Sequence, residues 1–349
     1  MSGRLAVVLF NLGGPDGPAA VEPFLFNLFN DPAIIGAPTP IRWLLAKVLS
    51  RRRAKVARDI YAKLGGGSPL LPLTRDQAGA LQSELTARGR VARTFVCMRY
   101  WHPMSEAVAA EVRAYAPEKI VLLPLYPQFS TTTTGSSLAD WQGAAQRAGI
   151  GAATVRVCCY PVQAGFIAAV AERVRDSLAS AALSVPVRLL FSAHGLPKRV
   201  IAGGDPYQWQ VQQTCAAVVA ALGGEPDHRI CYQSRVGPLE WIGPSIEDAL
   251  AEAAADEVAV VVVPIAFVSE HSETLVELDI EYRERAEHLG IPAYVRVPAL
   301  ATAAGFIGGL ADLVEEAASR PPGDLVACGD CPGSWRRCPQ IVLSGEVRS

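Results

Sequence analysis

The chain has 349 residues, of which half are hydrophobic and 19% are charged, and its formal net charge is −2. This composition argues against extensive disorder, and the lack of a basic excess argues against a nucleic-acid partner. The length is enough for two domains of about 100–200 residues each.

The N-terminus and the cysteines bear on where the protein works. Residues 1–4 lead directly into a strand-like run, without the pattern of a signal peptide. The longest apolar run, Val258–Val268, is interrupted by Pro264 and is too short to span a bilayer. We therefore expect a cytoplasmic protein without a transmembrane segment, in which the eight cysteines are thiols or metal ligands before they are disulfides.

Strand-like apolar runs alternate with helical patterns along most of the chain. The expected strands are Leu5–Phe10, Val91–Met98, Lys119–Leu125, Ala153–Cys158, Val187–Phe191, Arg229–Gln233, Val258–Phe267 and Ala293–Val297. The helical patterns between them include Ser105–Tyr115, Gly165–Ser180, Pro206–Leu222 and Glu270–Leu289. This alternation predicts parallel βαβ units in an α/β fold, with four strands on each side of a midpoint near residue 160. We expect one lobe over residues 1–158, a second over 159–320, a cysteine-bearing extension over 321–349 and a ligand cleft between the lobes.

Two glycine-rich turns lie in the first lobe. Asn11–Pro15 follows the first strand but lacks the G-x-G-x-x-G pattern of dinucleotide binding. Gly65–Pro69 lacks the lysine of a phosphate-binding loop. Tight turns are the simpler interpretation, and an enzyme that uses a nucleotide or a phosphate is kept as an alternative.

Polar and aromatic side chains follow the second and third expected strands. Met98–Pro103 places Arg99 and Tyr100 at the carboxyl end of the second strand. After the third strand, Ser130–Ser137 offers seven hydroxyls close to Tyr126. Hydroxyls and backbone amides at a helix start can hold carboxylates, although a helix N-cap needs only one of them.

The central feature of the second lobe is the run Val187–Phe191, which ends in Ser192–Pro197. The glycine and proline of this segment stop the strand, so His194 should project from its carboxyl end. Ligands bind at this edge of open α/β sheets, and a histidine there can exchange protons or bind a metal. The plainer alternative is a histidine bonded into a turn. Trp241, beyond the next strand, is either ordinary packing or a platform for a flat ring.

A row of acids follows the seventh strand. In a helix, Glu273, Glu277 and Glu281 share one face, with His271 near its start. Like charges in a row repel, so a solvated helix gains nothing from this alignment. The functional interpretation is a ladder that carries protons or cations, and the histidine makes such a site softer and more suited to iron.

Three cysteines, Cys328, Cys331 and Cys338, lie in the tail at C-x2-C-x6-C spacing. This spacing fits zinc or an iron–sulfur cluster and does not decide between them. A fourth ligand is needed, and the adjacent pair Cys158 and Cys159 offers candidates.

These motifs, in this order, resemble the ferrochelatase family over nearly the whole chain. The matching stretches are Leu9–Pro15, Gly65–Pro69, Met98–Pro103, Leu125–Ser137, Ser192–Pro197, Gln233–Trp241 and Ser269–Asp279. The resemblance implies two Rossmann-like doubly wound lobes, each with a four-stranded parallel sheet, flanking a porphyrin cleft. It also implies a lyase that inserts ferrous iron into protoporphyrin IX to form protohaem, with release of two protons, in the last step of haem biosynthesis.

The same resemblance implies roles for individual residues. His194 matches the family's essential histidine and Glu273 its partner carboxylate, and with Glu277 and Glu281 they match the path of the iron substrate. The positions expected to bind the porphyrin are Arg99, Tyr100, Tyr126, Trp241, Tyr61 and Ser68.

The cysteines also fit the resemblance. Some family members carry a [2Fe–2S] cluster on C-terminal cysteines that are similar to Cys328, Cys331 and Cys338. Where the animal enzymes have their remaining cysteine, this chain has Thr131. Resemblance to cluster-bearing bacterial members favours Cys158 over Cys159 as the fourth ligand.

We therefore expect His194 to accept pyrrole protons from a bent macrocycle, while Glu273 and the acids after it remove charge or deliver iron. A chelatase for coproporphyrin or another metal, and a non-catalytic carrier of tetrapyrrole or metal, are kept as alternatives. The expected partners are protoporphyrin IX and Fe²⁺, with peripheral membrane contact through the basic run 51–53 as a further option. We expect a monomer or a homodimer.

Overall fold

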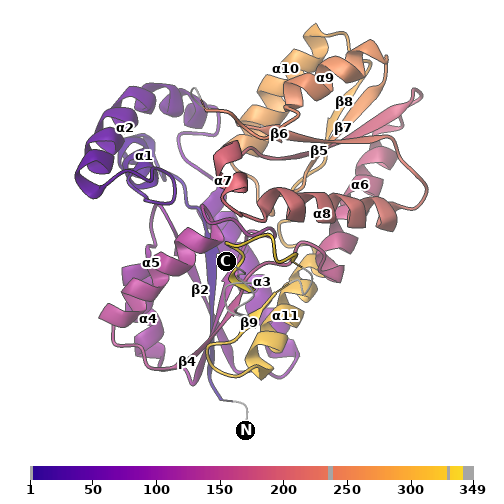
Figure 1. The fold of residues 1–349 in the computed structure, drawn as a ribbon. Coiled ribbons are helices and arrows are strands. Elements are labelled where there is room, and N and C mark those ends of the chain that lie inside the picture. The colour runs from indigo at the N-terminus through magenta and orange to yellow at the C-terminus, as the bar shows by residue number, and fades with distance from the viewer. Residues whose placement is uncertain (1–2, 235–238, 328–330, 341–349) are drawn as a thin grey trace. The chain divides into compact units, whose positions relative to one another are not determined.

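The computed structural model describes residues 3–234, 239–327 and 331–340. They form two compact units, the first built from residues 3–159 and 310–327 and the second from residues 160–309 and 331–340. Each unit contains one parallel β-sheet (Figure 1). The chain returns to the first unit within helix α11 (Ala304–Ser319).

The sheet of the first unit has five strands. Their spatial order is β2 (Ala92–Met98), β1 (Leu5–Asn11), β3 (Lys119–Pro124), β4 (Ala153–Val157) and β9 (Leu325–Val326). All seven residues of β1 are buried, as expected for a central strand with both faces covered. The predicted number of four strands is wrong for this sheet, because the two-residue β9 pairs with the end of β4. A strand so short and distant in sequence has no periodic signal of its own.

Helices of the first unit pack against this sheet or, in the case of the Val21–Phe29 and Thr39–Ala62 helices, mainly against each other. They are η1 (Pro18–Ala20), α1 (Val21–Phe29), α2 (Thr39–Ala62), α3 (Leu70–Ala87), α4 (Ser105–Tyr115) and α5 (Thr134–Arg147). Apolar side chains of α4 and α5 form one core with β1, β2 and β3. The ring of Trp141 on α5, for example, meets the ring of Phe10 on β1 edge to face.

The sheet of the second unit has four parallel strands, as predicted. Their order is β6 (His228–Gln233), β5 (Val187–His194), β7 (Ala259–Pro264) and β8 (Tyr294–Arg296). The helices of this unit are α6 (Ala164–Ala181), α7 (Lys198–Ala202), α8 (Tyr207–Leu222), α9 (Ile246–Ala255), the π-helix η2 (Glu273–Glu281) and α10 (Tyr282–His288). The prediction of an α/β fold with two parallel sheets is confirmed.

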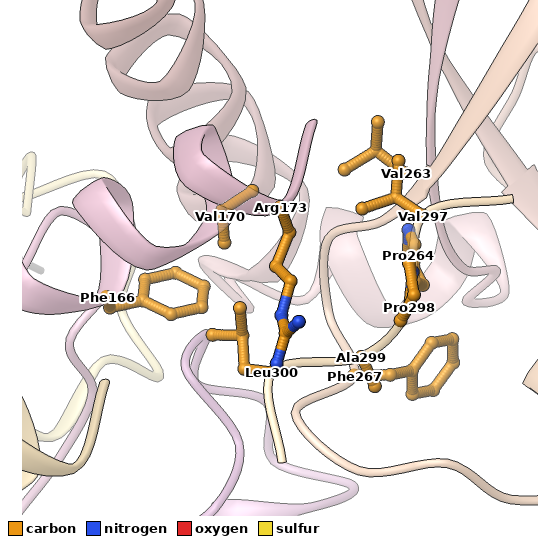
Figure 2. Close-up of a pocket in the computed structure, with 10 residues that line it drawn as sticks. All are labelled: Phe166, Val170, Arg173, Val263, Pro264, Phe267, Val297, Pro298, Ala299 and Leu300. Atoms are coloured by element: carbon orange, nitrogen blue, oxygen red, sulfur yellow. The ribbon is translucent and has the colours of Figure 1, made fainter. Parts of the chain in front are cut away.

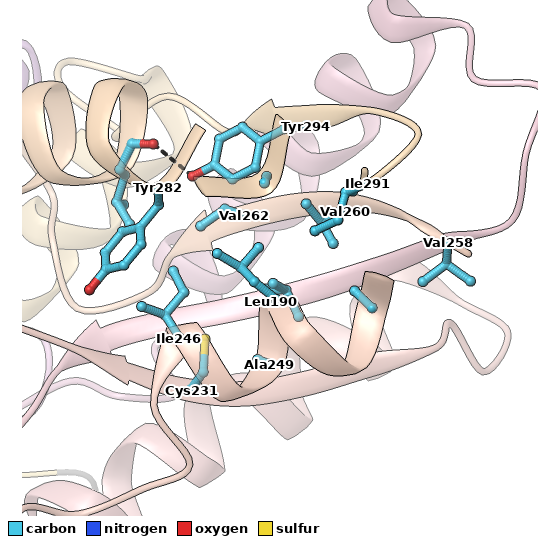
Figure 3. Packing of buried hydrophobic residues seen from close by; sticks show 14 residues of the cluster. Leu190, Cys231, Ile246, Ala249, Val258, Val260, Val262, Tyr282, Ile291 and Tyr294 are labelled. Atoms are coloured by element: carbon cyan, nitrogen blue, oxygen red, sulfur yellow. Dashed lines mark hydrogen bonds between the residues drawn. The ribbon is translucent and has the colours of Figure 1, made fainter. Parts of the chain in front are cut away.

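A buried cluster joins one face of this sheet to α9, η2 and α10 (Figure 3). Leu190 and Val262 are completely buried in it. The hydroxyl of Tyr294 on β8 donates a 2.7 Å hydrogen bond to the carbonyl of Leu278 in η2. The π-helix is therefore held to the sheet by apolar packing and by a buried polar contact.

The eight expected strands are present, but two of their ends differ from the expectation by three residues, the others differ by at most one, and one helix also differs. β5 continues to His194, and β7 stops at Pro264 rather than at Phe267. The helix expected over Glu270–Leu289 begins at Glu273, and its first nine residues form a π-helix. Hydrogen bonds from i to i+5 define that helix, and spacing of apolar residues alone does not separate it from an α-helix.

Substitution of Gly165 in α6 by alanine should destabilise the second unit. The added Cβ would lie 2.5 Å from the carbonyl oxygen of Gly305 and 3.0 Å from the Cα of Gly309, so backbone must move. We expect the free energy of unfolding to fall by about 1–3 kcal/mol in urea denaturation.

Gly79→Ala in α3 is the matched control. Nothing lies within 4 Å of a Cβ at this helical position, so we expect a gain of up to about 1 kcal/mol from helix propensity. Equal effects of the two substitutions would contradict the close approach of α6 and α11.

Candidate active site

His194 is the last residue of β5, at the carboxyl end of an inner strand of its sheet. In the neighbouring strand β6 it stands opposite Gln233. The hydroxyl of Tyr207, the first residue of α8, donates a 3.1 Å hydrogen bond to the His194 carbonyl. The next residue must be Gly195, because a Cβ there would lie 2.9 Å from the carbonyl oxygen of Gln233. The local backbone thus holds the imidazole at the edge where ligands bind in such sheets.

The imidazole of His194 contacts the carboxylate of Glu273, with 2.9 Å between Nδ1 and Oε2. An ionised carboxylate only accepts hydrogen bonds, so Nδ1 carries the proton and Nε2 of the neutral ring keeps its lone pair. Burial alone would lower the pKa of His194, but the charge and hydrogen bond of Glu273, with a smaller effect of Glu277, raise it above its usual value. The ring is 37% exposed, so a ligand can reach it.

Glu273 is the first residue of η2 and has a second histidine beside it. The Nε2 atom of His271 lies 3.8 Å from the same Oε2 atom that His194 contacts. Nδ1 of His271 faces the carbonyl of Ser269 at 3.2 Å and therefore donates to it. Burial would raise the pKa of Glu273, but the two histidines hold it well below its usual value. His271 belongs to the sequence motif around Glu273 but is not among the site positions that the family resemblance implies, and the structure places it beside the carboxylate.

Glu277, one turn further along η2, is held by the end of β6. Its carboxylate accepts hydrogen bonds from the backbone N–H of Ser234 at 2.9 Å and from the Ser234 hydroxyl at 2.6 Å. The side-chain amide of Gln233 donates to it at 3.2 Å. Burial, and then the charge of Glu273, raise the pKa of Glu277 despite these bonds. Two carboxylates one turn apart thus have pKa values shifted in opposite directions.

Arg296, the last residue of β8, ties η2 to the sheet. It pairs with Glu270 before the helix at 2.8 Å and with Asp279 inside it at 2.7 Å. Its side chain is only 9% exposed, and both neighbouring carboxylates compensate its charge. Glu281, the third acid of the predicted row, lies at the exposed end of η2. The structure therefore brings Glu273 and Glu277 to the histidine, and the role of Glu281 in an acidic path stays a prediction.

Arg99 and Tyr100 follow β2 in the first unit, and a buried carboxylate organises both. Asp31 pairs with the Arg99 guanidinium at 2.9 Å and accepts the Tyr100 hydroxyl at 2.8 Å. Nε of Arg99 donates to the Ser136 hydroxyl at 2.7 Å, and that hydroxyl in turn donates to Asp31. Tyr100 is fully buried. No sequence pattern distinguishes Asp31, because its partners come from other segments of the chain.

The other predicted porphyrin-binding residues take different places. Tyr61 is buried in the cluster that joins α1 and α2 to Tyr100, and half-buried Tyr126 packs on the core beside α5. Ser68 accepts a hydrogen bond from the N–H of Leu70 at the start of α3. Trp241, in the second unit, forms a β-bridge with Pro197, and its ring lies against Gly195 beside His194.

A cavity near this site, lined by Phe166, Arg173 and Phe267 among others, is too small to be the binding site (Figure 2). Its volume of about 10 Å³ has room for about one water molecule. Phe267 does support the site, because its ring packs at 4.5 Å on the ring of His271.

The cysteines lie in both units. Cys158 and Cys159 are buried directly after β4. Cys331 and Cys338 are buried with Trp209 and Trp335, and the Gln210 amide donates to Sγ of Cys331 at 3.4 Å. Cys328 lies outside the described residues. Within residues 3–234, 239–327 and 331–340, no three His, Cys, Asp or Glu side chains converge as ligands of one metal ion.

The chain is similar to curated proteins and to a solved structure. A family model described as Ferrochelatase matches residues 4–318. The curated protein named Ferrochelatase from Caulobacter vibrioides (strain NA1000 / CB15N) is 54% identical over 343 residues, covering 97% of this chain and 98% of that protein. The one from Phenylobacterium zucineum (strain HLK1) is 52% identical over 337 residues, covering 96% and 97%.

A solved structure is similar at a greater distance. SirB from Bacillus subtilis with Fe³⁺ matches with a TM-score of 0.53 and 12% identity, over 91% of this chain and 96% of SirB. At this identity the likeness concerns the fold alone, and it agrees with the chelatase-like architecture expected from the sequence. The family match over residues 4–318 and the identity with the curated relatives show that the chain belongs to the ferrochelatase family.

Proposed function

We propose that this protein is a ferrochelatase, a lyase that inserts ferrous iron into protoporphyrin IX and releases two protons. The observation that carries the proposal is the His194–Glu273 contact of 2.9 Å, which leaves Nε2 of a partly exposed imidazole as a proton acceptor. The relatives named Ferrochelatase support the choice of reaction over the carrier and nucleotide alternatives. An anaerobic assay with Fe²⁺ and protoporphyrin IX tests it, since a carrier would bind the porphyrin without the absorbance change of metallation.

Proton removal is the step for which the site is best suited. Nε2 of His194 takes a pyrrole proton, and the imidazolium that forms is stabilised by the ionised Glu273. Glu277, whose pKa is raised, is the next group on η2 that can take up a proton. The same carboxylates, with Glu281 at the exposed end, offer oxygen ligands to the incoming iron substrate.

The residues proposed to bind the porphyrin are described within each unit separately. In the first unit Arg99, fixed by Asp31 and Ser136, is a cation suited to a propionate carboxylate. Tyr100, being buried, would act by holding Arg99, whose guanidinium lies 5.0 Å from its ring centre. Tyr61, Ser68 and Tyr126 in the first unit and Trp241 in the second complete the proposed binding set.

His194→Ala should abolish metal insertion and leave porphyrin binding in place, because the substitution removes the proton acceptor alone. We expect kcat to fall by about 100-fold or more, measured anaerobically by porphyrin absorbance, with the Kd for protoporphyrin unchanged in fluorescence quenching. Near-normal turnover would refute the assignment of His194.

The dependence of activity on pH should report the charge of Glu273. Because this carboxylate raises the pKa of His194, the base of the wild type becomes protonated, and inactive, at a higher pH than an isolated imidazole would. In Glu273→Gln the pKa of His194 should fall, so the acidic limb of the kcat/KM profile should move to lower pH while the maximum rate decreases. An unchanged acidic limb would contradict the coupling, and Glu287→Gln, an exposed acid on α10, is the control.

We also propose a [2Fe–2S] cluster held by Cys158, Cys328, Cys331 and Cys338. Two of these thiols are buried beside the same tryptophans, and one accepts an amide N–H, as thiolates of such clusters do. When bound, the cluster would supply one-electron redox chemistry. It would not take part in proton removal, for which the imidazole and the carboxylates suffice.

Protein purified anaerobically should be coloured, with about two iron and two sulfide ions per chain. Cys158→Ser should lose the cluster, whereas Cys159→Ser, its neighbour in sequence, should keep it. Metal analysis and visible absorbance measure both. A colourless wild type that contains zinc would contradict the cluster, and equal loss in the two variants would contradict the choice of Cys158.

A third part of the proposal is peripheral contact with an anionic membrane. Across the described ranges, every helix is too short or too polar to cross a bilayer. α2, however, exposes Trp43 and Leu44 by 50% and 59%, followed by the basic run 51–53. Apolar and basic side chains on one helix suit the interface of an anionic bilayer. The cytoplasmic location and the oligomeric state stay predictions.

Wild-type protein should therefore sediment with vesicles that contain phosphatidylglycerol, and Trp43→Glu/Leu44→Glu should not. The substituted side chains would place charge where the wild type has apolar surface. A double variant that sediments like the wild type would contradict the contact.

A further inference from the structure

A groove of about 380 Å³ lies between α1 and α2 of the first unit. Its walls include Glu22, Phe26 and Asn27 from α1 and Lys47 and Arg58 from α2. These residues are distinct from those proposed above to bind the porphyrin. The groove has the size of a small-ligand site and two cations that can meet an anion.

The charges in the groove are unequally compensated. Glu22 is engaged by Arg51, which lies outside the groove, with 3.5 Å between the charged atoms. Arg58 donates its Nε–H to the carbonyl of Pro18, which leaves its terminal N–H groups for a ligand. The ammonium of Lys47 lies 5.7 Å from the ring centre of Phe26. Within the described residues, neither Lys47 nor Arg58 forms an ion pair with a carboxylate.

The groove adjoins the apolar surface of the same helix. Trp43 and Leu44 precede Lys47 by four and three residues, so they lie beside it on the surface of the helix, and both are exposed. The ring of Trp43 also meets the ring of Phe26 in the groove wall, edge to face. A free anion would contact only the two cations. A phospholipid would contact the cations with its phosphate and the apolar side chains with its acyl chains, because these two parts of a lipid lie at adjacent depths.

We propose that this groove binds the phosphate of an anionic phospholipid headgroup, through the terminal N–H groups of Arg58 and the ammonium of Lys47. Arginine donates two parallel hydrogen bonds to phosphate oxygens, and lysine adds a point charge. Trp43 and Leu44 then lie at the level of the first acyl carbons. The proposal rests on the peripheral membrane contact proposed above and assigns it one specific lipid site.

Vesicle sedimentation with three proteins tests the site. The groove variant Lys47→Gln/Arg58→Gln and the control Arg52→Gln/Lys55→Gln remove the same charge from the same helix, but the control residues lie outside the groove. On vesicles with phosphatidylglycerol we expect the groove variant to bind about tenfold or more weaker than the wild type, and the control only a few-fold weaker. On phosphatidylcholine alone, the three proteins should bind equally.

Other outcomes overturn the proposal in separate ways. Equal weakening in the two variants would replace the lipid site by general attraction between α2 and an anionic surface. Binding of inorganic phosphate to the wild type but not to the groove variant, with both proteins binding the vesicles equally, would assign the groove to a soluble anion. Failure of the wild type to bind any vesicle would reject the membrane contact itself, and a metal-insertion assay in detergent would still report on the catalytic proposal.

Discussion

The contact between the imidazole of His194 and the carboxylate of Glu273 is the interaction on which the site depends. It joins two residues that are 79 positions apart in the chain, His194 at the end of β5 and Glu273 at the start of η2. The carboxylate decides which ring nitrogen carries the proton and raises the pKa of the ring. An imidazole without this partner would be a weaker base with either nitrogen free to donate.

Polar contacts from the sheet hold this pair and the helix η2 that carries Glu273. Gln233 on β6 donates to Glu277 and accepts from the hydroxyl of Ser192 on β5 at 2.7 Å, which links these two strands to the π-helix. Arg296 holds η2 through Glu270 and Asp279. Buried polar networks of this kind stabilise one geometry only when each member has its partners. The shape of the site is therefore a property of the sheet and of η2 together.

Helix α8 connects the histidine to the cysteine-bearing tail within the second unit. Tyr207 bonds to the carbonyl of His194, and Gln210, one turn further, bonds to the thiol of Cys331. The tail also forms a hydrogen bond from the N–H of Arg337 to the carbonyl of Gly204, just before α8. The first turn of α8 thus contacts both the strand end that carries His194 and the tail that carries Cys331, which are separate motifs in the sequence.

Apolar runs and the residues that end them determined the strands, the parallel sheets and the place of His194, because these depend on local pattern and chain direction. The resemblance of ordered motifs to one family determined the choice of Glu273 as the partner of His194. Only the tertiary structure decided that η2 is a π-helix, that β9 joins the first sheet, and that Asp31 lies beneath Arg99. It also decided that Glu273 and Glu277 have oppositely shifted pKa values. Burial and neighbouring charge depend on segments distant in sequence, and no local spacing reports them.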